Sequence, residues 1–289
     1  MKKFRILVTG SKSQIAKEIK IISKKFNCFK FFFLTKKKLD INDSVKIKKI
    51  ILSYKINIIV NCAAYTDVDK AEKDKKQCKK INFFAVKKLA LLCKSMNIIL
   101  IHFSTDYVFN GNSKNMYNEN SKTNPINYYG YTKLLADEAI LKIRPHGMII
   151  RTSWVYSSFG KNFVKTIYNF NILKKEISVV SDQYGTPTFA KDIAINLLKI
   201  ISSTNFTKKI HPIKIYNFSS GVKTSWYKFA REIYKNKKLI KPISSNKYKF
   251  KTKRPHNSSL KCNRVFKHFN IKFPHWKVSL KKCILNIKR

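Results

Sequence analysis

The chain has 289 residues, of which 44% are hydrophobic and 13% aromatic, and this composition excludes a disordered chain and supports one large or two smaller folded units. Its formal charge of +46 comes from 61 Lys and Arg residues against 15 Asp and Glu, which raises the question of nucleic-acid binding. The lysines run from Lys2 to Lys288 without a long block of like charge, and only 7 basic residues are Arg, the residue that contacts bases and phosphates bidentately. We therefore attribute the charge to biased composition, and we expect attraction for anionic small molecules rather than a nucleic-acid partner.

Strands and helices alternate over the first half of the chain. Short apolar runs predict strands at residues 4–8, 29–34, 56–61, 98–103 and 148–152. Between them, apolar periodicity predicts a helix that ends near residue 25 and helices at 43–54, 79–96 and 129–143, the one at 43–54 with Asn42 as its N-cap. This alternation predicts an α/β fold with a doubly wound parallel sheet, the Rossmann arrangement, in which helices cover both faces.

After about residue 153 the alternation is less regular. Helices are predicted at residues 162–173, 190–201, 226–234 and 278–285, and strands at 177–180 and 213–218, whereas the polar segment 241–254 is predicted as a loop. We expect a dinucleotide-binding domain over residues 1–152. A smaller C-terminal region, residues 153–289, is expected to fold over the sheet and to share strands with it.

The turn after the first strand has small residues where a dinucleotide-binding fold has glycines. Gly10, Ser13 and Ala16 occupy the positions that serve for a tight turn, close approach of the pyrophosphate and packing of the helix. Ser13 and Ala16 are small enough for the last two roles, and the N–H groups at the start of the helix can bind phosphate. Because two of the three glycines are missing, the turn alone is a weak signal.

The end of the second strand bears on the choice of cofactor. An acidic residue there usually binds the adenosine ribose, but this chain has Thr35 followed by three lysines at 36–38. Cations at this point suit a 2′-phosphate and favour NADPH over NADH, unless the lysines only reflect the composition. Asp40 and Ile41 can flank the adenine instead.

A second group of polar residues follows the fourth strand. Tyr129 and Lys133 are spaced i, i+4 in a predicted helix, so their side chains share one face a turn apart. A cation favours the phenolate, and we expect Lys133 to lower the pKa of Tyr129 from about 10 and make it a proton donor near neutral pH. Ser104 and Thr105 end the strand, where they can hold a substrate oxygen against the phenol. These residues can place a proton on a carbonyl oxygen, although a Tyr–Lys pair is common by chance in a chain with 14 Tyr.

Cysteine usage and hydropathy indicate the compartment. The six cysteines show no Cys-x-x-Cys pair and no Cys/His ligand spacing, so we expect free thiols in a reducing cytoplasm and no metal site. The basic start of the chain with the apolar run at 4–8 superficially resembles a secretory signal, but the run is too short. No apolar run approaches membrane-spanning length. The sequence predicts a soluble cytoplasmic protein with no membrane partner.

Several longer stretches together resemble one family. They are VNCAAYTDVDKAE at 60–72, STDYVF at 104–109, YGYTK at 129–133, RTSWVY at 151–156, NF at 162–163, DQYGTPT at 182–188, TSW at 224–226 and RPHNSSL at 254–260, with Gly10, Gln14, Gly111, Pro125 and Asn127 between them. Through these stretches the chain resembles the extended short-chain dehydrogenase/reductases, and among them the dTDP-4-dehydrorhamnose reductases, over nearly its full length. The combination is far more specific than any single motif.

The resemblance implies reduction of the C4 keto group of dTDP-4-dehydro-L-rhamnose to give dTDP-L-rhamnose, whose expected destination is cell-envelope polysaccharide. By this similarity Tyr129 donates the proton, Lys133 holds the nicotinamide ribose and Thr105 binds the reacting oxygen. It implies a site for NADPH, with NADH as the alternative, at Gly10, Ser13, Gln14, Ile15, Thr35, Asp40, Ile41, Ala64, Tyr65, Thr66 and Phe103 together with Tyr129 and Lys133. It implies that residues 153–289 bind the sugar nucleotide and that the substrate contacts Thr105, Asp106, Trp154 and Arg254, the last as a clamp on the diphosphate.

Departures from the family pattern leave alternatives open. Ser13 and Ala16 replace family glycines, which can weaken cofactor binding, and Lys191 stands where some members carry a glutamate of a metal-linked dimer, so monomer and homodimer are both open. A sugar-nucleotide 4,6-dehydratase needs an acid–base pair, and family dehydratases have Asp-Glu where this chain has Asp106 and Tyr107.

Three further alternatives concern the function itself. The chain can be another sugar-nucleotide-modifying short-chain dehydrogenase, or a non-catalytic NADP-binding regulatory subunit of methionine adenosyltransferase. The intact Thr105, Tyr129 and Lys133 argue against the regulatory subunit. A nucleic-acid binder is the third, and it predicts salt-sensitive duplex binding that NADPH does not change.

Overall fold

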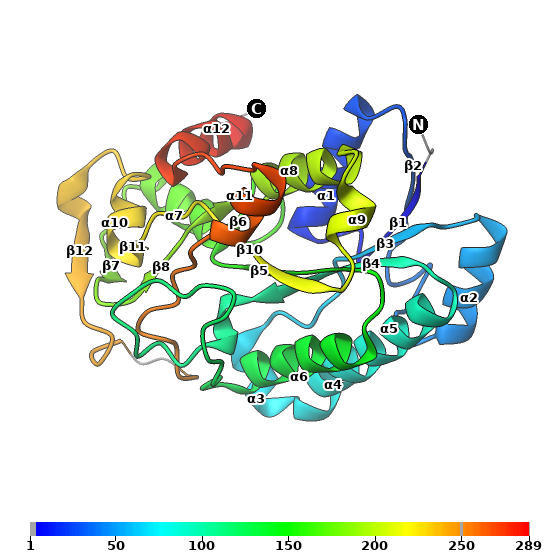
Figure 1. Cartoon of the computed structure of the whole chain (residues 1–289). Helices are drawn as coiled ribbons and strands as arrows, with labels where there is room; N and C mark the ends of the chain where they lie inside the picture. Colours follow the sequence, from blue (N-terminus) through cyan, green and yellow to red (C-terminus); the bar gives the residue numbers. More distant parts are fainter. Residues whose placement is uncertain (1–3, 249–250, 289) are drawn as a thin grey trace.

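A six-stranded parallel sheet forms the centre of the molecule (Figure 1). The computed structural model describes residues 4–248 and 251–288. The strand order is β10-β5-β4-β3-β1-β2, and the strands are β1 (Arg5–Thr9), β2 (Lys30–Phe33), β3 (Ile58–Asn61), β4 (Ile99–Thr105), β5 (Gly147–Thr152) and β10 (Lys214–Phe218). From β1, the next strand β2 is added on one side and all later strands on the other, so the strand order switches between β1 and β3. Ligands of open parallel sheets bind at this switch point. The predicted doubly wound α/β fold is confirmed.

Helices cover both faces of this sheet (Figure 1). One face is covered by α1 (Gln14–Ile22) and α8 (Ala190–Ser202), and the other by α2 (Ser44–Ser53), α5 (Ala85–Ser95) and α6 (Tyr128–Ile143). Along β1, Ile6 and Val8 pack into the first layer and Leu7 into the second. Because a strand buried on both faces needs apolar side chains at successive positions, these strands appear in the sequence as continuous apolar runs.

A bulged helical segment connects β3 to α5. It consists of α3 (Val68–Lys73), α4 (Lys75–Lys79) and a π-helical turn, η2 (Lys80–Phe84), that leads directly into α5. The helix predicted at 79–96 is therefore a π turn followed by an α-helix. The π turn surrounds Asn82, which is fully buried, and π turns of this kind often occur at functional sites.

Much of the C-terminal region packs beside the carboxyl ends of the sheet, with the helices α7 (Phe163–Ile172), α10 (Trp226–Arg231) and α12 (Trp276–Lys288). The helices α9 (Phe206–Lys209) and α11 (Asn263–Phe269) instead pack into the first layer on the sheet, through Phe206 and Val265. The strands of the C-terminal region pair as β6 (Val155–Tyr156) with β9 (Thr188–Phe189), β7 (Ile177–Val180) with β12 (Ile240–Ile243), and β8 (Tyr184–Gly185) with β11 (Thr224–Ser225). Single-turn 3₁₀ helices occur at η1 (Ser23–Lys25), η3 (Asp106–Val108) and η4 (Lys237–Leu239). Tyr156, Phe229 and Trp276 lie in a separate apolar core for this region.

Two predictions about local structure are wrong. The N-cap of α2 is Asp43 and not Asn42, because the Asp43 carboxylate accepts the backbone N–H of Lys46 at 2.8 Å. The segment predicted as a loop at 241–254 begins in β12, which escapes a pattern search because Lys241 and Pro242 are exposed. The signal-like residues 1–3 and residues 249–250 of that segment lie outside the described residues. In the part of the chain that the structure describes, no helix is long and apolar enough to cross a membrane.

Candidate active site

A cavity of about 520 Å³ opens at the carboxyl ends of β1, β3 and β4. Its wall includes both Ser104 and Trp226. It brings together eleven of the residues predicted for the site, namely Ser13, Gln14, Ile15, Ala64, Thr66, Phe103, Thr105, Asp106, Tyr129, Lys133 and Trp154. The residues predicted for cofactor, proton transfer and sugar thus share one space, although they come from segments far apart in the sequence.

The turn between β1 and α1 shows why one glycine suffices. Gly10 has φ +58°, and a Cβ on it would lie 2.7 Å from the backbone of Ala63, so this position requires glycine. Ser13 has an ordinary φ of −66° and caps α1, because its hydroxyl accepts the N–H of Ala16 at 3.3 Å. Ala16 is buried in the core under the helix. The backbone of a dinucleotide-binding turn is retained, and the α1 N-terminus faces the cavity through Ser13 as a site suited to phosphate.

The loop after β3 is held by a residue that the sequence analysis did not single out. Asn82 accepts the N–H of Tyr65 at 2.8 Å and donates to the Tyr65 carbonyl at 3.0 Å, so it fixes this backbone from both sides. Its amide nitrogen also lies 3.2 Å from the hydroxyl of Thr132 on α6. A buried asparagine inside an apolar helical pattern was the available signal. The clamp aligns the Ala64–Thr66 loop along the cavity, while the Tyr65 side chain itself is not part of the wall.

Tyr129 and Thr105 meet inside the cavity. Asn127 caps α6 by accepting the N–H of Gly130 at 2.8 Å, which begins the helix just before Tyr129. Burial raises the pKa of Tyr129 above its ordinary value, and a hydrogen bond with the Thr105 hydroxyl opposes this shift. At neutral pH the Tyr129 phenol is therefore protonated.

Lys133 is buried and lines the same cavity. Its Nζ donates to the carbonyl of Phe103 at 2.7 Å and lies 3.0 Å from Nε2 of His102. Burial lowers the pKa of Lys133 to about 8. The expected lowering of the Tyr129 pKa is not found, since its pKa moves in the opposite direction. The physical reason is that removal of the phenol from water disfavours the phenolate more strongly than its polar neighbours favour it.

Asp106 lies in the same cavity with three hydroxyl partners. It accepts hydrogen bonds from Ser153 at 2.9 Å and from Thr105 at 3.1 Å, and it also bonds to the Ser258 side chain. Burial nevertheless raises the pKa of Asp106 to about 6. With this pKa the carboxyl group is mostly ionised at neutral pH, and its negative charge is one of the causes that raise the pKa of Tyr129.

Two tryptophans form the wall between the cavity and the C-terminal region. Trp154 has φ +46°, an uncommon conformation for a bulky residue, and its ring stacks on Trp226 with centroids 3.4 Å apart. Gly185 also lies against the Trp154 indole, so close that an added Cβ would be 2.2 Å from a ring carbon. Trp226 is a site residue without a predicted role, because only the tertiary fold brings it to Trp154.

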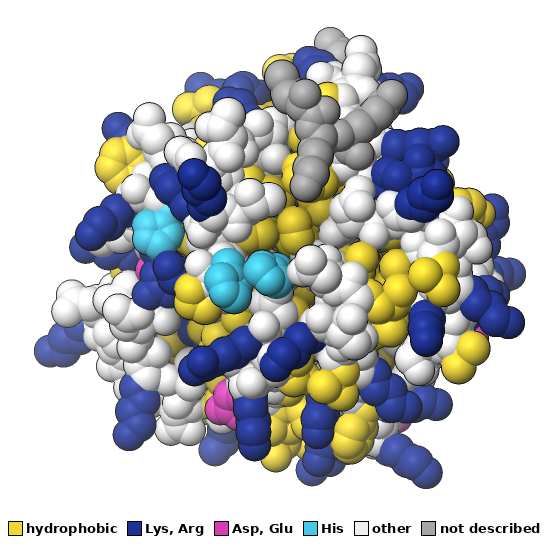
Figure 2. All heavy atoms as spheres, turned by 45° about the vertical axis from the view of Figure 1, so that its right-hand side comes forward, with side chains coloured by type: hydrophobic (Ala, Val, Ile, Leu, Met, Phe, Trp, Pro, Cys, Tyr) yellow, Lys and Arg dark blue, Asp and Glu magenta, His cyan; other side chains and the backbone are white. Residues whose placement is uncertain are grey.

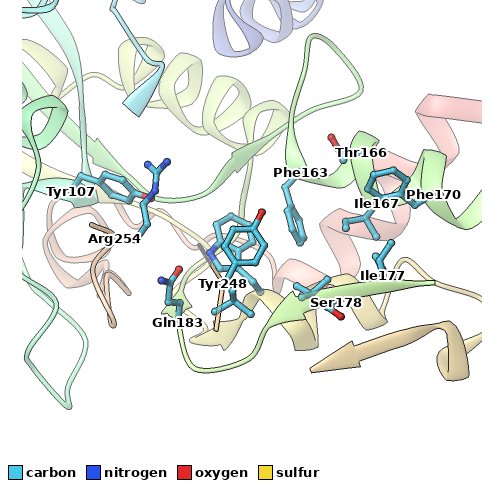
Figure 3. A pocket seen from close by; sticks show the side chains of 13 residues that line it. Tyr107, Phe163, Thr166, Ile167, Phe170, Ile177, Ser178, Gln183, Tyr248 and Arg254 are labelled. Carbon is cyan, nitrogen blue, oxygen red and sulfur yellow. The ribbon is translucent and has the colours of Figure 1, made fainter. Parts of the chain in front are cut away.

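A second pocket of about 360 Å³ adjoins the first and shares Tyr107 and Trp226 with it. Tyr107 and Arg254 lie together on one side, and Phe163, Phe170 and Ile177 on the other (Figure 3). Arg254 therefore lines this pocket and not the first cavity. Aromatic and aliphatic walls beside a guanidinium suit a flat apolar ring attached to a phosphate.

Four predicted cofactor residues lie outside the cavity wall, Thr35, Asp40, Ile41 and Tyr65, and Gly10 lies beneath it. The segment after β2 nevertheless adjoins the glycine turn, because Ser11 N–H donates to the Leu34 carbonyl at 3.2 Å. Asp40 accepts the N–H of Asn42 at 2.9 Å, and this hydrogen bond is the main cause that lowers the pKa of Asp40. Ile41 is buried. The structure thus brings the end of β2 to the glycine turn, but it does not place Thr35, Asp40 or Ile41 in the cavity wall.

Lys and Arg side chains are scattered over the face in Figure 2 rather than confined to one part of it, and Asp and Glu are rare there. The attribution of the charge to biased composition stays a prediction. Among the described residues, no group of three or more His, Cys, Asp or Glu side chains is placed to hold a metal ion.

Comparison with known proteins places these observations in context. A family model described as the RmlD substrate binding domain matches residues 4–289. The spore coat polysaccharide biosynthesis protein SpsK of Bacillus subtilis is 35% identical over 97% of this chain and 96% of its own length, and a dTDP-4-dehydrorhamnose reductase of Sinorhizobium fredii is 33% identical over 97% and 96%. The crystal structure of a dTDP-4-dehydrorhamnose reductase from Bacillus anthracis in complex with NADP superimposes with a TM-score of 0.90 at 29% identity, over 98% of this chain and 99% of that one.

Proposed function

The chain belongs to the RmlD substrate-binding domain family, and we propose that it reduces the C4 keto group of dTDP-4-dehydro-L-rhamnose to give dTDP-L-rhamnose. Its class is that of NAD(P)H-dependent oxidoreductases that reduce a keto group of a sugar nucleotide. The observation that carries the proposal is the convergence of Thr105, Tyr129 and Lys133 in one buried cavity beside the Gly10 turn.

Tyr129 is the proton donor in this proposal. A reduction leaves negative charge on the former carbonyl oxygen, and a protonated phenol within hydrogen-bond reach can neutralise it. The raised pKa of Tyr129 supports this role, because the phenol carries its proton at neutral pH. Thr105, which hydrogen-bonds the phenol, holds the reacting oxygen beside it. Lys133, in its ammonium form, stabilises the phenolate that the transfer creates.

The fit of the cavity to a dinucleotide supports NADPH as the cofactor, which when bound supplies the hydride. Ser13, Gln14 and Ile15 would hold the diphosphate at the α1 N-terminus, and Ala64 and Thr66 would line its path. Thr35, Asp40 and Ile41 would flank the adenosine. The lysines at 36–38 are exposed beside Thr35 and suit a 2′-phosphate; NADH is the alternative donor.

The second pocket is proposed to hold the nucleotide part of the substrate. Arg254 would bind the diphosphate, and the aromatic side chains of the pocket, such as Phe163, would enclose the thymine. The sugar then extends past Tyr107 and Trp226, which line both spaces, towards Asp106 and Trp154. A dehydratase would need a second carboxylate beside Asp106, and this chain has Tyr107, whose pKa burial raises to about 12, so the phenol cannot replace a carboxylate base.

A direct assay tests the proposal. Purified protein is incubated with dTDP-4-dehydro-L-rhamnose and NADPH, the nicotinamide absorbance is followed, and the product is identified by mass spectrometry. We expect NADPH consumption that forms dTDP-L-rhamnose and that is lost in Tyr129→Phe. NADPH binding without consumption would instead support a regulatory binding subunit, and consumption only with a different keto sugar nucleotide would support a related reductase.

A further inference from the structure

We propose that His102 is a positioning residue that favours the uncharged form of Lys133 and so sets the pH above which the site loses its cation. The inference rests on the reductase function proposed above. His102 is not part of the cavity wall, and no role in the mechanism has been assigned to it so far. It acts, in this proposal, only through Lys133.

His102 is a polar ring inside an apolar layer. Leu100, two residues earlier on the same face of β4, packs with Ala136 and Ile140 of α6, and His102 itself is fully buried in this layer. An imidazolium here would have neither water nor a carboxylate partner. Burial and the charge of Lys133 hold the pKa of His102 well below its ordinary value. The ring is therefore neutral, with one N–H donor and one acceptor nitrogen.

The Asn61 side chain decides which ring nitrogen carries the proton. Its Oδ1 accepts the backbone N–H of Ala63 at 3.3 Å and the hydroxyl of Thr9 at 2.7 Å. A backbone N–H can only donate, so the amide oxygen must face Ala63 and the NH₂ group must face His102. The NH₂ group lies 3.1 Å from Nδ1 of His102. Since NH₂ is a donor, Nδ1 is the acceptor and the proton is on Nε2.

That proton points at Lys133, whose Nζ lies 3.0 Å from Nε2. An ammonium group has three donors and no lone pair, so it cannot accept an N–H. A neutral amine can accept this proton and still donate to the carbonyl of Phe103, 2.7 Å away. The backbone N–H of Ala63 thus fixes the orientation of the Asn61 amide, and this amide fixes the proton of His102 on Nε2. Every donor in this series has an acceptor only when Lys133 is uncharged.

Other titratable groups near Lys133 oppose this effect. Asp137, one turn later on α6, and Cys78 on α4 both favour the ammonium form. Asp137 already forms a buried ion pair with Arg151 at 3.1 Å, which weakens its effect. Tyr129 shares the cavity and keeps its proton at neutral pH, whereas Asp106, whose pKa is about 6, is mostly ionised there and adds to this opposition. Burial lowers the pKa of Lys133 to about 8 against these groups, and in our proposal the contact with Nε2 of His102 acts in the same direction as burial.

The consequence is an upper pH limit for reduction. Stabilisation of the phenolate needs the ammonium form, so kcat/KM should fall as the pH rises through the pKa of Lys133 near 8. In His102→Gln the side-chain amide reaches the Nε2 position and its oxygen can accept from the ammonium. We expect the falling limb of the pH profile to move up by about one pH unit or more, because hydrogen bonds to charged groups are the stronger ones.

His102→Asn is the matched variant. Its amide oxygen takes the place of Nδ1 and keeps the contact with Asn61, but the side chain is too short to reach Lys133. The pH at which kcat/KM falls should therefore shift less in His102→Asn than in His102→Gln. If His102 has only a packing role, both variants lose activity but their kcat/KM falls at the same pH as in the wild type. This result would overturn the inference.

A measurement that needs no substrate separates this inference from the proposed function. The ¹⁵N shifts of the His102 ring, assigned by their absence in His102→Asn, should show a protonated Nε2 and a bare Nδ1 in the wild-type protein. They should also titrate near pH 8 as Lys133 loses its proton. A proton on Nδ1, or a charged ring at neutral pH, contradicts the inference even if reduction is observed. If the wild-type protein reduces no substrate, the proposed function is rejected. The ¹⁵N shifts of the His102 ring then still test the inference about His102 and Lys133.

Discussion

Nη2 of Arg254 donates to a carboxylate oxygen of Asp69 at 2.8 Å and thereby ties the C-terminal segment to α3, the helix after β3. The guanidinium also lies over the Tyr107 ring, 6.0 Å from its centroid. Arg254 is thus held in the second pocket, against the Tyr107 ring that lines both pockets. A diphosphate bound to Arg254, as proposed, would compete with Asp69, so the ion pair would set both the position and the availability of the guanidinium.

Arg254→Ala should raise KM for the sugar nucleotide by about tenfold to a hundredfold, because hydrogen bonds to charged groups contribute about 1.5–3 kcal/mol. The KM for NADPH should change little, since Arg254 does not line the first cavity. Asp69→Asn is the control. It keeps the size of the partner and removes its charge, and we expect KM to stay or fall by a few-fold, as suits a partly exposed ion pair. Steady-state kinetics with each substrate varied in turn would check both variants; an equal rise of KM in both would mean that the ion pair only supports the fold.

Tyr129→Phe should lower kcat by about 10² to 10⁴-fold with little change in either KM, because the variant removes the proton donor and leaves the ring. Tyr131, two residues later on the same helix, is exposed and outside the cavity wall, so Tyr131→Phe is a matched control that should keep wild-type kcat. NADPH binding, followed by fluorescence, should be the same in all three proteins. A Tyr129→Phe protein that retains more than a tenth of kcat would exclude this phenol as the donor.

The central sheet could be predicted from the sequence because most of its strands are buried on both faces and the edge strand β2 is a short aromatic run. The run that forms β4 is apolar at successive positions, and such a run needs no partner to be recognised. The two-residue strands β6, β8, β9 and β11 show no periodicity, and β12 contains Lys241 and Pro242, so only tertiary pairing reveals them. The spacing of Tyr129 and Lys133 correctly predicted that they share a helix face, and both line the cavity.

The electrostatics of the site could not be predicted in the same way. From the sequence, Lys133 is a cation beside a phenol, which predicts a lowered pKa of Tyr129. The structure adds burial, which the sequence does not contain, and burial reverses the direction of the shift. His102 appeared as one histidine in an apolar strand, and its contact with Lys133 depends on how α6 packs on the sheet. A contact between residues so far apart in the sequence depends on the tertiary fold, and the local sequence pattern does not predict it.

Asp106 should make the stability of the protein depend on pH in an unusual direction. Burial raises its pKa to about 6 from an ordinary 3.8, so folding favours the protonated form. Its stabilising contribution is therefore complete below about pH 4 and is lost as the pH rises through 6, on the order of 3 kcal/mol in total. Asp106→Asn cannot titrate. Urea unfolding of both proteins should be measured at several pH values between 4 and 7. The free energy of unfolding of the wild type should fall relative to that of the variant as the pH rises, and a constant difference between the two would contradict the raised pKa of Asp106.

Gly185→Ala should disturb the part of the cavity proposed to bind the sugar without changing Thr105, Tyr129 or Lys133. A methyl group on Gly185 would overlap the indole of Trp154, and the stacking of this indole on Trp226, with centroids 3.4 Å apart, restricts its movement. Overpacking of this kind costs about 1–3 kcal/mol of stability, and we expect a raised KM for the sugar nucleotide with an unchanged KM for NADPH.

The matched control for this variant is Gly221→Ala. Gly221 has φ +67° with no atom within 4 Å of an added Cβ, so the substitution strains the backbone without filling space. It should destabilise the protein while both KM values stay at the wild-type level. Trp154→Phe combined with Gly185→Ala should recover part of the lost stability, because the smaller ring leaves room for the methyl group. Thermal unfolding and steady-state kinetics on the four proteins test the argument, and a Gly185→Ala protein with wild-type kinetics would show that Trp154 does not contact the sugar.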